Sequence, residues 1–409
     1  MAKHRSHASA TRARVEDALA WIDAHAGVLT AEDVPVTEGA GRILARDELA
    51  NFDIPPFDRA AVDGIAVRAE ETVGASTYNP CLLQFITPAG DLAPGGTCRI
   101  NAGEILPGGA DAVVRLEQVG ADAAGRATLT EPIVAGSGVE RKGSQAVRGR
   151  PLAAAGRRLR PTDIALFACA GLGRVAVVRK PRVRCLLADA TIPPGSPSAQ
   201  SRAYDANRPL LRALIERDAG IALEQRTIPR DASSLRHALM LPGADLILLV
   251  GGTGCGSNDY AASALMEAGE IANHGVALRH AETAGMGVVA GVLAFLLPGA
   301  PIACLLAYEY FAGRAVRRLG GHPAALPFPS LSMTVARKIV SEIGLTELRP
   351  VRCLGDGSAE PIAFFAEAGL SALTEADGFV LIPEKSEGYP QGATVTVYLY
   401  SGYDRAQSQ

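Results

Sequence analysis

The hydrophobic pattern is most regular in the middle of the chain, where short apolar runs alternate with amphipathic segments. Such alternation predicts a doubly wound parallel α/β domain. Ligands of such sheets bind outside the carboxyl ends of the strands, so we expect the loops at Asp189, Arg230–Asp231, Gly251–Asp259 and Leu297–Pro301 to share one rim. The predicted strands are 183–188, 223–228, 245–250 and 288–297, and the predicted helices are 207–216, 233–241, 261–267 and 302–319.

The pattern changes on both sides of this domain. Residues 14–26 have helical apolar spacing, whereas the stretches after residue 51 and after residue 323 are short β-prone runs separated by turn residues. Thr162-Asp163 is expected to cap a helix that ends near Ala170. The predicted organisation is a disordered tail at 1–13, a discontinuous elongated helical and mixed domain at 14–50 and 140–180, an inserted small β domain at 51–139, the α/β domain at 181–322, and a C-terminal β-barrel-like domain at 323–409.

Composition narrows the function classes. The net charge is −3, so no global basic field recruits nucleic acid or an anionic membrane. The uncharged stretch 284–308 is broken by Pro298 and Pro301, and its halves are too short to cross a bilayer. Seven scattered cysteines without a CxxC pair favour a reducing compartment, which predicts a cytoplasmic location.

The segment GGTGCGSNDY at 251–260 is the most informative local signal. It follows an apolar strand and precedes a helix, and its glycines allow a sharp turn with exposed backbone N–H groups. Such a turn can cradle an anionic ligand. An ordinary strand-to-helix turn is the alternative, and Cys255 within it is expected to be a packed thiol because no histidine or second cysteine lies at ligand spacing.

Six motifs, in order, resemble those of the molybdopterin molybdotransferase family, which includes MoeA and the gephyrin E domain. They are FDRAAVDGIAVR at 57–68, GEILPGGADAVV at 103–114, YDAN at 204–207, GGTGCGSNDY at 251–260, LPGAP at 297–301 and ADGFVLIPE at 376–384. The resemblance spans about residue 15 to 400.

The resemblance implies four domains, an elongated homodimer and a role in molybdenum cofactor synthesis. Enzymes of this family take adenylylated molybdopterin, bind molybdate and release the nucleotide as the metal enters the dithiolene. It also implies that Asp63 reaches the site from the partner chain. The implied ligands are molybdopterin or its adenylylated form, molybdate and Mg²⁺.

The sequence departs from the family pattern at the expected site. An acidic pair after one strand is reduced to Asp189, a threonine is replaced by Ala102, two acids by Ser144 and Gln145, a loop serine by Gly254, and a lysine by Glu282. A carboxylate in place of that lysine repels a phosphate, so we expect Glu282 to turn into solvent or to pair with an arginine.

The candidate residues follow from the motifs. Asp63 and Asp259 are the catalytic candidates, and with Asp189 they are also the candidate metal ligands; capping a turn or a helix is the alternative role for Asp63 and Asp259. Asp205 and Asn207 are expected to cap the following helix, and Arg279 is the best remaining cation for a phosphate. The cofactor-binding candidates are Gly251, Gly252, Thr253, Gly254, Gly256, Ser257, Tyr260, Arg279, Pro298, Gly299, Pro301, Asp205 and Asp231.

Three functions remain open. The chain is an enzyme that promotes molybdate insertion, a catalytically degenerate molybdopterin-binding chaperone or assembly scaffold for a molybdoenzyme client, or an interaction scaffold without a ligand. The glycine loop favours the first two, and the lost acids together with Glu282 favour the second.

Overall fold

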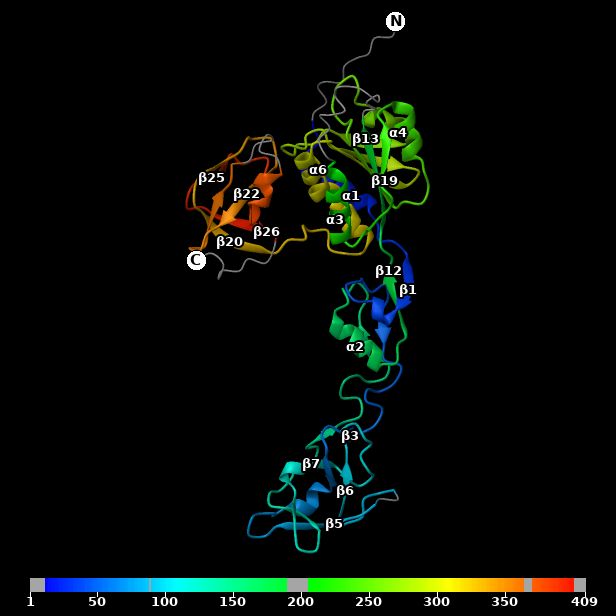
Figure 1. Ribbon diagram of the computed structural model, residues 1–409, viewed down its shortest axis with the longest axis vertical. Coiled ribbons are helices and arrows are strands. Elements are labelled where there is room, and N and C mark those ends of the chain that lie inside the picture. The colour runs from blue at the N-terminus through cyan, green and yellow to red at the C-terminus, as the bar shows by residue number, and fades with distance from the viewer. Residues whose placement is uncertain (1–11, 88–89, 190–204, 364–369, 401–409) are drawn as a thin grey trace. The chain divides into compact units, whose positions relative to one another are not determined.

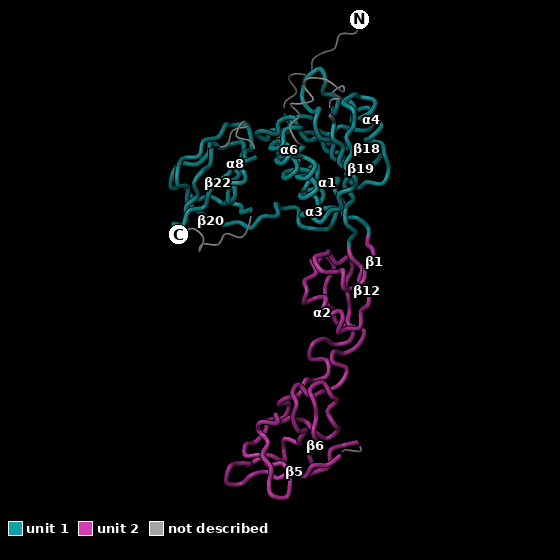
Figure 2. The backbone as a smooth tube through the Cα atoms, viewed as in Figure 1, with its two compact units in different colours: residues 1–30, 178–409 teal, residues 31–177 magenta. Residues whose placement is uncertain are grey.

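The computed structural model describes residues 12–87, 90–189, 205–363 and 370–400, shown as coloured ribbon in Figure 1. The chain divides into one unit of residues 1–30 and 178–409 and a second unit of residues 31–177 (Figure 2). Most of the predicted tail lies outside the described residues. Ala13, placed in that tail by the sequence pattern, instead forms a bridge with Val276.

A seven-stranded mixed sheet is the centre of the first unit. Its order is β14-β13-β16-β19-β18-β17, with β15 also paired to β13. The pairs among β13, β14, β15, β16 and β19 are parallel, as predicted, whereas β17 and β18 add an antiparallel edge. The strands are β13 (Arg182–Asp189), β14 (Ile221–Ala222), β15 (Arg226–Pro229), β16 (Leu246–Val250), β17 (Glu270–His274), β18 (Gly285–Val289) and β19 (Val292–Leu297).

Side chains alternate between two cores because successive residues of a strand face opposite sides of the sheet. In β16, Leu246 and Leu248 pack in one buried cluster, whereas Ile247 and Leu249 pack in the other. The first cluster contains α1 (Val15–His25), α3 (Asn207–Arg217), α6 (Pro301–Ala307), the π-helix η5 (Tyr308–Ala312) and α7 (Gly313–Leu319); the second contains α4 (Ala232–Leu239) and α5 (Ala261–Ala268).

Several local predictions differ from the structure. The predicted strand 223–228 is instead two short strands, β14 and β15, and β17 was not predicted. The apolar run 288–297 is a hairpin of β18 and β19 rather than one strand, because Ala290 and Gly291 turn the backbone with φ values of 49° and 82°. Helix α1, placed by the sequence pattern in the discontinuous domain, packs into the α/β core through Val15, Ala18 and Ile22. Burial of its apolar face decides its position.

The C-terminal region of the first unit is a closed barrel, in line with the predicted barrel-like domain. Its strand order is β20-β23-β22-β24-β26, and a short antiparallel β21–β25 pair and α8 accompany it. The elements are β20 (Ser330–Val335), β21 (Ile339–Val340), β22 (Glu347–Cys353), β23 (Ser358–Pro361), α8 (Ser371–Thr374), β24 (Gly378–Ile382), β25 (Gly388–Tyr389) and β26 (Thr394–Leu399).

The second unit contains a six-stranded sheet in the order β7-β4-β6-β5-β9-β8, within the predicted inserted segment. The β-prone runs at 65–67 and 112–114 lie in β4 and β7, which pair antiparallel. The elements are β3 (Arg59–Ala60), β4 (Gly64–Val67), η2 (Ala69–Thr72), β5 (Cys81–Phe85), β6 (Gly96–Ile100), β7 (Ala112–Arg115), η3 (Leu116–Gln118), β8 (Gly120–Ala121), β9 (Ala127–Leu129) and β10 (Val139–Glu140).

Flanking segments build a separate small core in the second unit. Helix α2 buries Phe167 against Val36, Leu44 and Val177. Asp163 lies at the third position of α2 rather than at its cap, and it accepts a hydrogen bond from the Arg160 N–H at 2.8 Å. The elements are β1 (Ala31–Pro35), η1 (Val36–Glu38), β2 (Glu48–Leu49), β11 (Pro151–Ala153), α2 (Pro161–Cys169) and β12 (Arg174–Val178).

Asp163 is expected to stabilise the second unit through its charge. The Arg157 guanidinium, which donates to both Asp163 oxygens at 2.8 and 3.1 Å, lowers the pKa of Asp163 from 3.8 to about 2. Because the pKa is lower in the folded state, the ionised carboxylate stabilises the folded protein. This stabilisation is fully present above the unfolded pKa of 3.8 and is lost as the pH falls toward 2. It amounts to about 2 kcal/mol.

We therefore expect Asp163→Asn to lower the unfolding temperature at pH 7 and to converge with the wild type near pH 2. Calorimetry of the full chain from pH 7 downward measures this, with Glu117→Gln, an exposed acid on η3, as the matched control. Equal unfolding temperatures for Asp163→Asn and wild type at pH 7 would contradict the assignment.

Candidate functional site

Three loops meet at the carboxyl ends of the parallel strands, as the sequence predicted. The Gly251 N–H donates to the Leu297 carbonyl at 2.9 Å, which ties the loop after β16 to the loop after β19. The Asn207 Nδ2, at the start of α3, donates to the Gly299 carbonyl at 2.8 Å. The Oδ1 of Asn207 is buried and has no hydrogen-bond partner among the described residues, so this junction retains an unused acceptor.

Glycine is required where these loops approach one another. Gly251 and Gly252 adopt φ values of 86° and 66°, a region that L-residues with side chains rarely occupy. A Cβ on Gly251 would lie 3.1 Å from the Ala188 carbonyl, and a Cβ on Gly299 would lie 3.4 Å from the Gly251 Cα. The predicted glycine and Pro-Gly loops therefore form one connected rim.

The tip of the glycine loop is exposed from Cys255 to Asn258. Within the described residues, the N–H groups of Gly254, Cys255 and Ser257 donate no hydrogen bond, so they are available to an anion. The Asp259 Oδ2 accepts from the Gly256 N–H at 3.0 Å. Asp259 therefore braces the loop and does not cap α5, whose N-cap residue is Tyr260.

Neighbouring side chains hold this loop. The Thr253 and Thr283 hydroxyls are 3.0 Å apart, and His274 Nε2 lies 2.9 Å from the Thr253 carbonyl oxygen. His274 is thus structural. Cys255, expected as a packed thiol, is exposed instead, because the loop turns its tip outward.

Arg230 lies in a loop that the sequence predicted at the rim, but it was not among the cofactor-binding candidates. Its Nη2 donates to the Ala188 carbonyl at 3.2 Å, and a Cβ on Gly251 would lie 3.4 Å from the same nitrogen. The Nε of Arg230 is buried without a hydrogen-bond partner among the described residues. Its place directly after β15, at the strand end, was the available signal.

The neighbouring acids have structural roles. Asp231 caps α4 by accepting from the Ser234 N–H at 2.8 Å, and this bond lowers the pKa of Asp231 below its ordinary value. Asp205 accepts from the N–H groups of Asn207 and Arg208 at 3.0 and 3.1 Å, as a helix-capping side chain does. Both residues lie at the rim, and their carboxylates are already engaged.

Arg279 and Glu282 also depart from expectation. Arg279 Nη1 donates to Glu342 at 3.0 Å, and its Nε lies 3.9 Å from the buried Glu347, so its charge is shared with the C-terminal barrel. Glu282 was expected to turn away or to pair with an arginine. Instead it is half-buried in the wall of a cavity of about 440 Å³ with Pro301, and its carboxylate forms no ion pair among the described residues.

Comparison with known proteins places this rim in context. The "MoeA N-terminal region (domain I and II)" matches residues 13–171, the "Probable molybdopterin binding domain" matches residues 189–318, and the "MoeA C-terminal region (domain IV)" matches residues 332–400. A solved molybdopterin biosynthesis MoeA protein from Pyrococcus horikoshii is 31% identical, with a TM-score of 0.77 over 96% of this chain and 100% of that chain. The chain belongs to the MoeA family.

Curated relatives match over nearly their whole length. The molybdopterin molybdenumtransferase 2 of Mycobacterium tuberculosis is 29% identical across 89% of this chain and 94% of its own. The molybdopterin molybdenumtransferase of Staphylococcus aureus is 27% identical across 94% of this chain and 95% of its own. The suspected family and its place in molybdenum cofactor biosynthesis are therefore confirmed.

The other catalytic candidate of this MoeA-family chain, Asp63, lies in the second unit. Asp63 is exposed, and its Oδ1 accepts from the Ala102 N–H at 2.7 Å. The next residue, Gly64, has no room for a side chain, since a Cβ there would lie 2.0 Å from the Val114 carbonyl oxygen. Packing of β4 against β7 thus fixes the turn that presents the Asp63 carboxylate.

The described residues provide no preformed site for a metal ion. Among the described residues there is no group of three or more His, Cys, Asp or Glu side chains that could hold a metal ion. Asp259 is bonded to its own loop, and the side chain of Asp189 lies outside the described part. The described residues therefore do not form a Mg²⁺ site within one chain.

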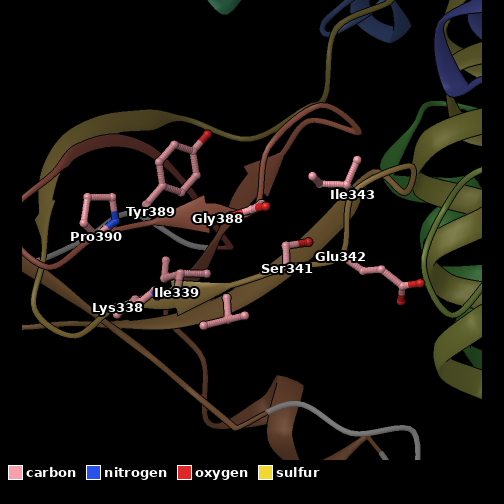
Figure 3. Close-up of a pocket in the computed structure, with 10 residues that line it drawn as sticks. Lys338, Ile339, Ser341, Glu342, Ile343, Gly388, Tyr389 and Pro390 are labelled. Atoms are coloured by element: carbon pink, nitrogen blue, oxygen red, sulfur yellow. The ribbon is translucent and has the colours of Figure 1, made fainter.

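A second cavity of about 560 Å³ lies at the paired strands β21 and β25. Figure 3 shows its walls coming from two segments, 338–343 and 387–390. None of the predicted site residues lines it.

No described helix has the length and apolar character needed to cross a bilayer.

The glycine loop gives a direct test of the rim geometry. We expect Gly251→Ala to cost roughly 1 kcal/mol of stability for its left-handed backbone, and more for its contact with the Ala188 carbonyl. Gly291→Ala is the matched control, since its φ of 82° is similar but nothing lies within 4 Å of its Cβ. Chemical denaturation measures both variants; an equal loss would show that the strand-end contact is not tight.

Proposed function

We propose that this protein is a molybdopterin molybdotransferase that binds molybdopterin, in its adenylylated form, at the α/β rim and promotes insertion of molybdate. The observation that supports this most is the joining of the glycine loop, the Gly299 loop and Arg230 at one sheet edge. The names of the relatives agree with it.

The rim has the chemistry that an anionic substrate needs. The N–H groups of Gly254, Cys255 and Ser257 and the guanidinium of Arg230 supply donors and one positive charge for a phosphate. Molybdate is an oxyanion and uses the same kind of donors. A bound anion would lie at the exposed tip of the glycine loop. Among the described residues, Asp259 is the carboxylate that accepts a hydrogen bond from the backbone of this loop tip.

The proposed reaction needs proton carriers. When molybdate exchanges one oxo group for the two sulfurs of a dithiol, both thiol protons leave with that oxygen as water. A carboxylate near the thiols can take up such a proton and pass it to the leaving oxygen. Asp259 and Asp63 are assigned this role, because each is held by a backbone N–H that leaves one carboxylate oxygen unused by that bond.

We also propose a homodimer in which a second copy supplies Asp63. The resemblance to the family supports this arrangement, and closed twofold pairs are the commonest protein assembly. The seven free cysteines support a reducing, cytoplasmic setting. A molybdoenzyme client or another protein of the cofactor pathway is the expected recipient of the product.

Charge removal at the two acids is expected to abolish insertion. Asp259→Asn and Asp63→Asn keep the shape and an acceptor oxygen but remove the proton carrier, so turnover should fall at least a hundredfold without unfolding. A reconstituted insertion assay with adenylylated molybdopterin and molybdate measures this. Asp356→Asn, an acid that likewise accepts a backbone N–H in a barrel turn, is the control. Full activity of both variants would reject the enzymatic assignment, and retained pterin binding with no wild-type insertion would favour the chaperone.

Mixing the two inactive variants tests the assembly. If each site combines Asp259 of one copy with Asp63 of the other, an equimolar mixture after subunit exchange regains about a quarter of wild-type activity, because half of the dimers carry one intact site of two. Sedimentation velocity at micromolar concentration should show the dimer. A stable monomer, or a mixture that stays inactive although mixed dimers form, would contradict a shared site.

A further inference from the structure

The 440 Å³ cavity beside the rim has an unusual lining for a site that handles anions. Ala300, Pro301, Ile302, Ala303 and Leu370 form apolar walls. Among the described residues, the polar side chains that line it are His280 and Glu282. The cavity is thus an apolar slot with a carboxylate in its wall, and its volume is in the range of small-molecule sites.

Among the described residues, Glu282 has no ion-pair partner. Burial and the adjacent Arg279 charge lower the pKa of His280, which disfavours a positive charge on its ring. Arg279 itself is engaged by Glu342 and lies near Glu347. Glu282 lines the cavity, and a carboxylate there offers acceptor oxygens to a ligand.

These features select one class of ligand group. A carboxylate repels phosphate and molybdate but accepts hydrogen bonds from N–H groups, and two oxygens match two N–H groups that lie side by side. Apolar walls fit a flat heteroaromatic ring. A 2-amino-4-oxopyrimidine ring, as in a pterin or a guanine, has this pair of adjacent donors, whereas adenine has one donor next to an acceptor nitrogen.

We propose that the cavity is the pterin subsite of this protein and that Glu282 is its specificity-determining residue, accepting the ring N–H and the 2-amino group. The inference deepens the proposed function by naming which end of the substrate enters here. It also explains how a glutamate can stand where the family has a lysine.

Two close approaches connect this subsite to the glycine loop. Thr283, next to Glu282, touches Thr253 of the glycine loop at 3.0 Å between hydroxyl oxygens. Pro301 of the cavity wall follows Gly299, whose Cβ position lies 3.4 Å from Gly251. A molecule with a pterin ring at Glu282 can therefore extend its anionic tail toward Gly254, Ser257 and Arg230.

Titration with 6-hydroxymethylpterin, which has the ring but no phosphate, tests the assignment on the full chain. Its intrinsic fluorescence reports binding, and adenosine is the comparison ligand. We expect wild type to prefer the pterin. Glu282→Gln should weaken pterin binding about tenfold to a hundredfold, because an amide replaces one charged acceptor by a donor. The same variant should bind adenosine no worse, since an amide matches one donor beside one acceptor.

Controls separate this inference from the proposed function. Glu267→Gln changes an exposed glutamate of α5 and should leave both titrations unchanged. Thermal unfolding of Glu282→Gln should occur at the wild-type temperature or above it, because the amide removes an unpartnered charge, so that a loss of binding is not a loss of folding. Equal pterin affinity in wild type and Glu282→Gln overturns the subsite even if metal insertion occurs. Selective pterin binding in a chain that never inserts molybdate leaves the subsite standing and removes only the enzymatic assignment.

Discussion

The rim depends on the parallel pairing of β16 with β19. Val250 and Leu297 are partners at the end of that ladder, and the Gly251 N–H continues the pattern by donating to the Leu297 carbonyl. This pairing makes two loops that are separated by 46 residues in sequence start side by side. The other rim contacts build on this pairing: Gly251 turns sharply with a φ of 86° and leaves no room for a side chain beside the Ala188 carbonyl, and Asn207 bonds to the Gly299 carbonyl on the third side.

Charge is divided along this rim. Arg230 lies against the glycine loop, whereas Arg279 is held by carboxylates of the barrel region and Glu282 borders the apolar cavity. One part of the edge therefore attracts an anion and the neighbouring part attracts N–H donors. The interaction energy of two charges in contact is about 4 kcal/mol in a medium of effective dielectric near 20. This energy is large enough to determine the orientation of a ligand that has an anionic end and an N–H donor end.

Local sequence was sufficient for the parallel part of the sheet, the strand-end loops and the barrel-like C-terminal domain, because these depend on apolar runs and glycines that are close together in the chain. It did not predict the antiparallel edge formed by β17 and β18. The placement of α1 could not be predicted locally, since its partners lie some 300 residues away in α7. Local sequence placed the Arg230–Asp231 loop at the rim, but it did not show which of the two side chains faces the glycine loop. That distinction comes from the Ala188 and Gly251 backbone, which the fold brings to Arg230.

The substitution of the family's lysine by Glu282 suggested a loss of ligand binding, but the burial of Glu282 supports a different interpretation. A lysine-to-glutamate change on an exposed rim would weaken anion binding and gain nothing. In the wall of an apolar cavity, an ionised carboxylate without a partner costs free energy in the empty protein. That cost is offset when a ligand donates hydrogen bonds to the carboxylate, so the charge improves discrimination between ligand rings. Binding of the anionic end is then left to Arg230 and the loop amides. The retained glycine loop and the altered cavity are therefore consistent with one substrate bound at two chemically different ends, rather than with loss of the ligand.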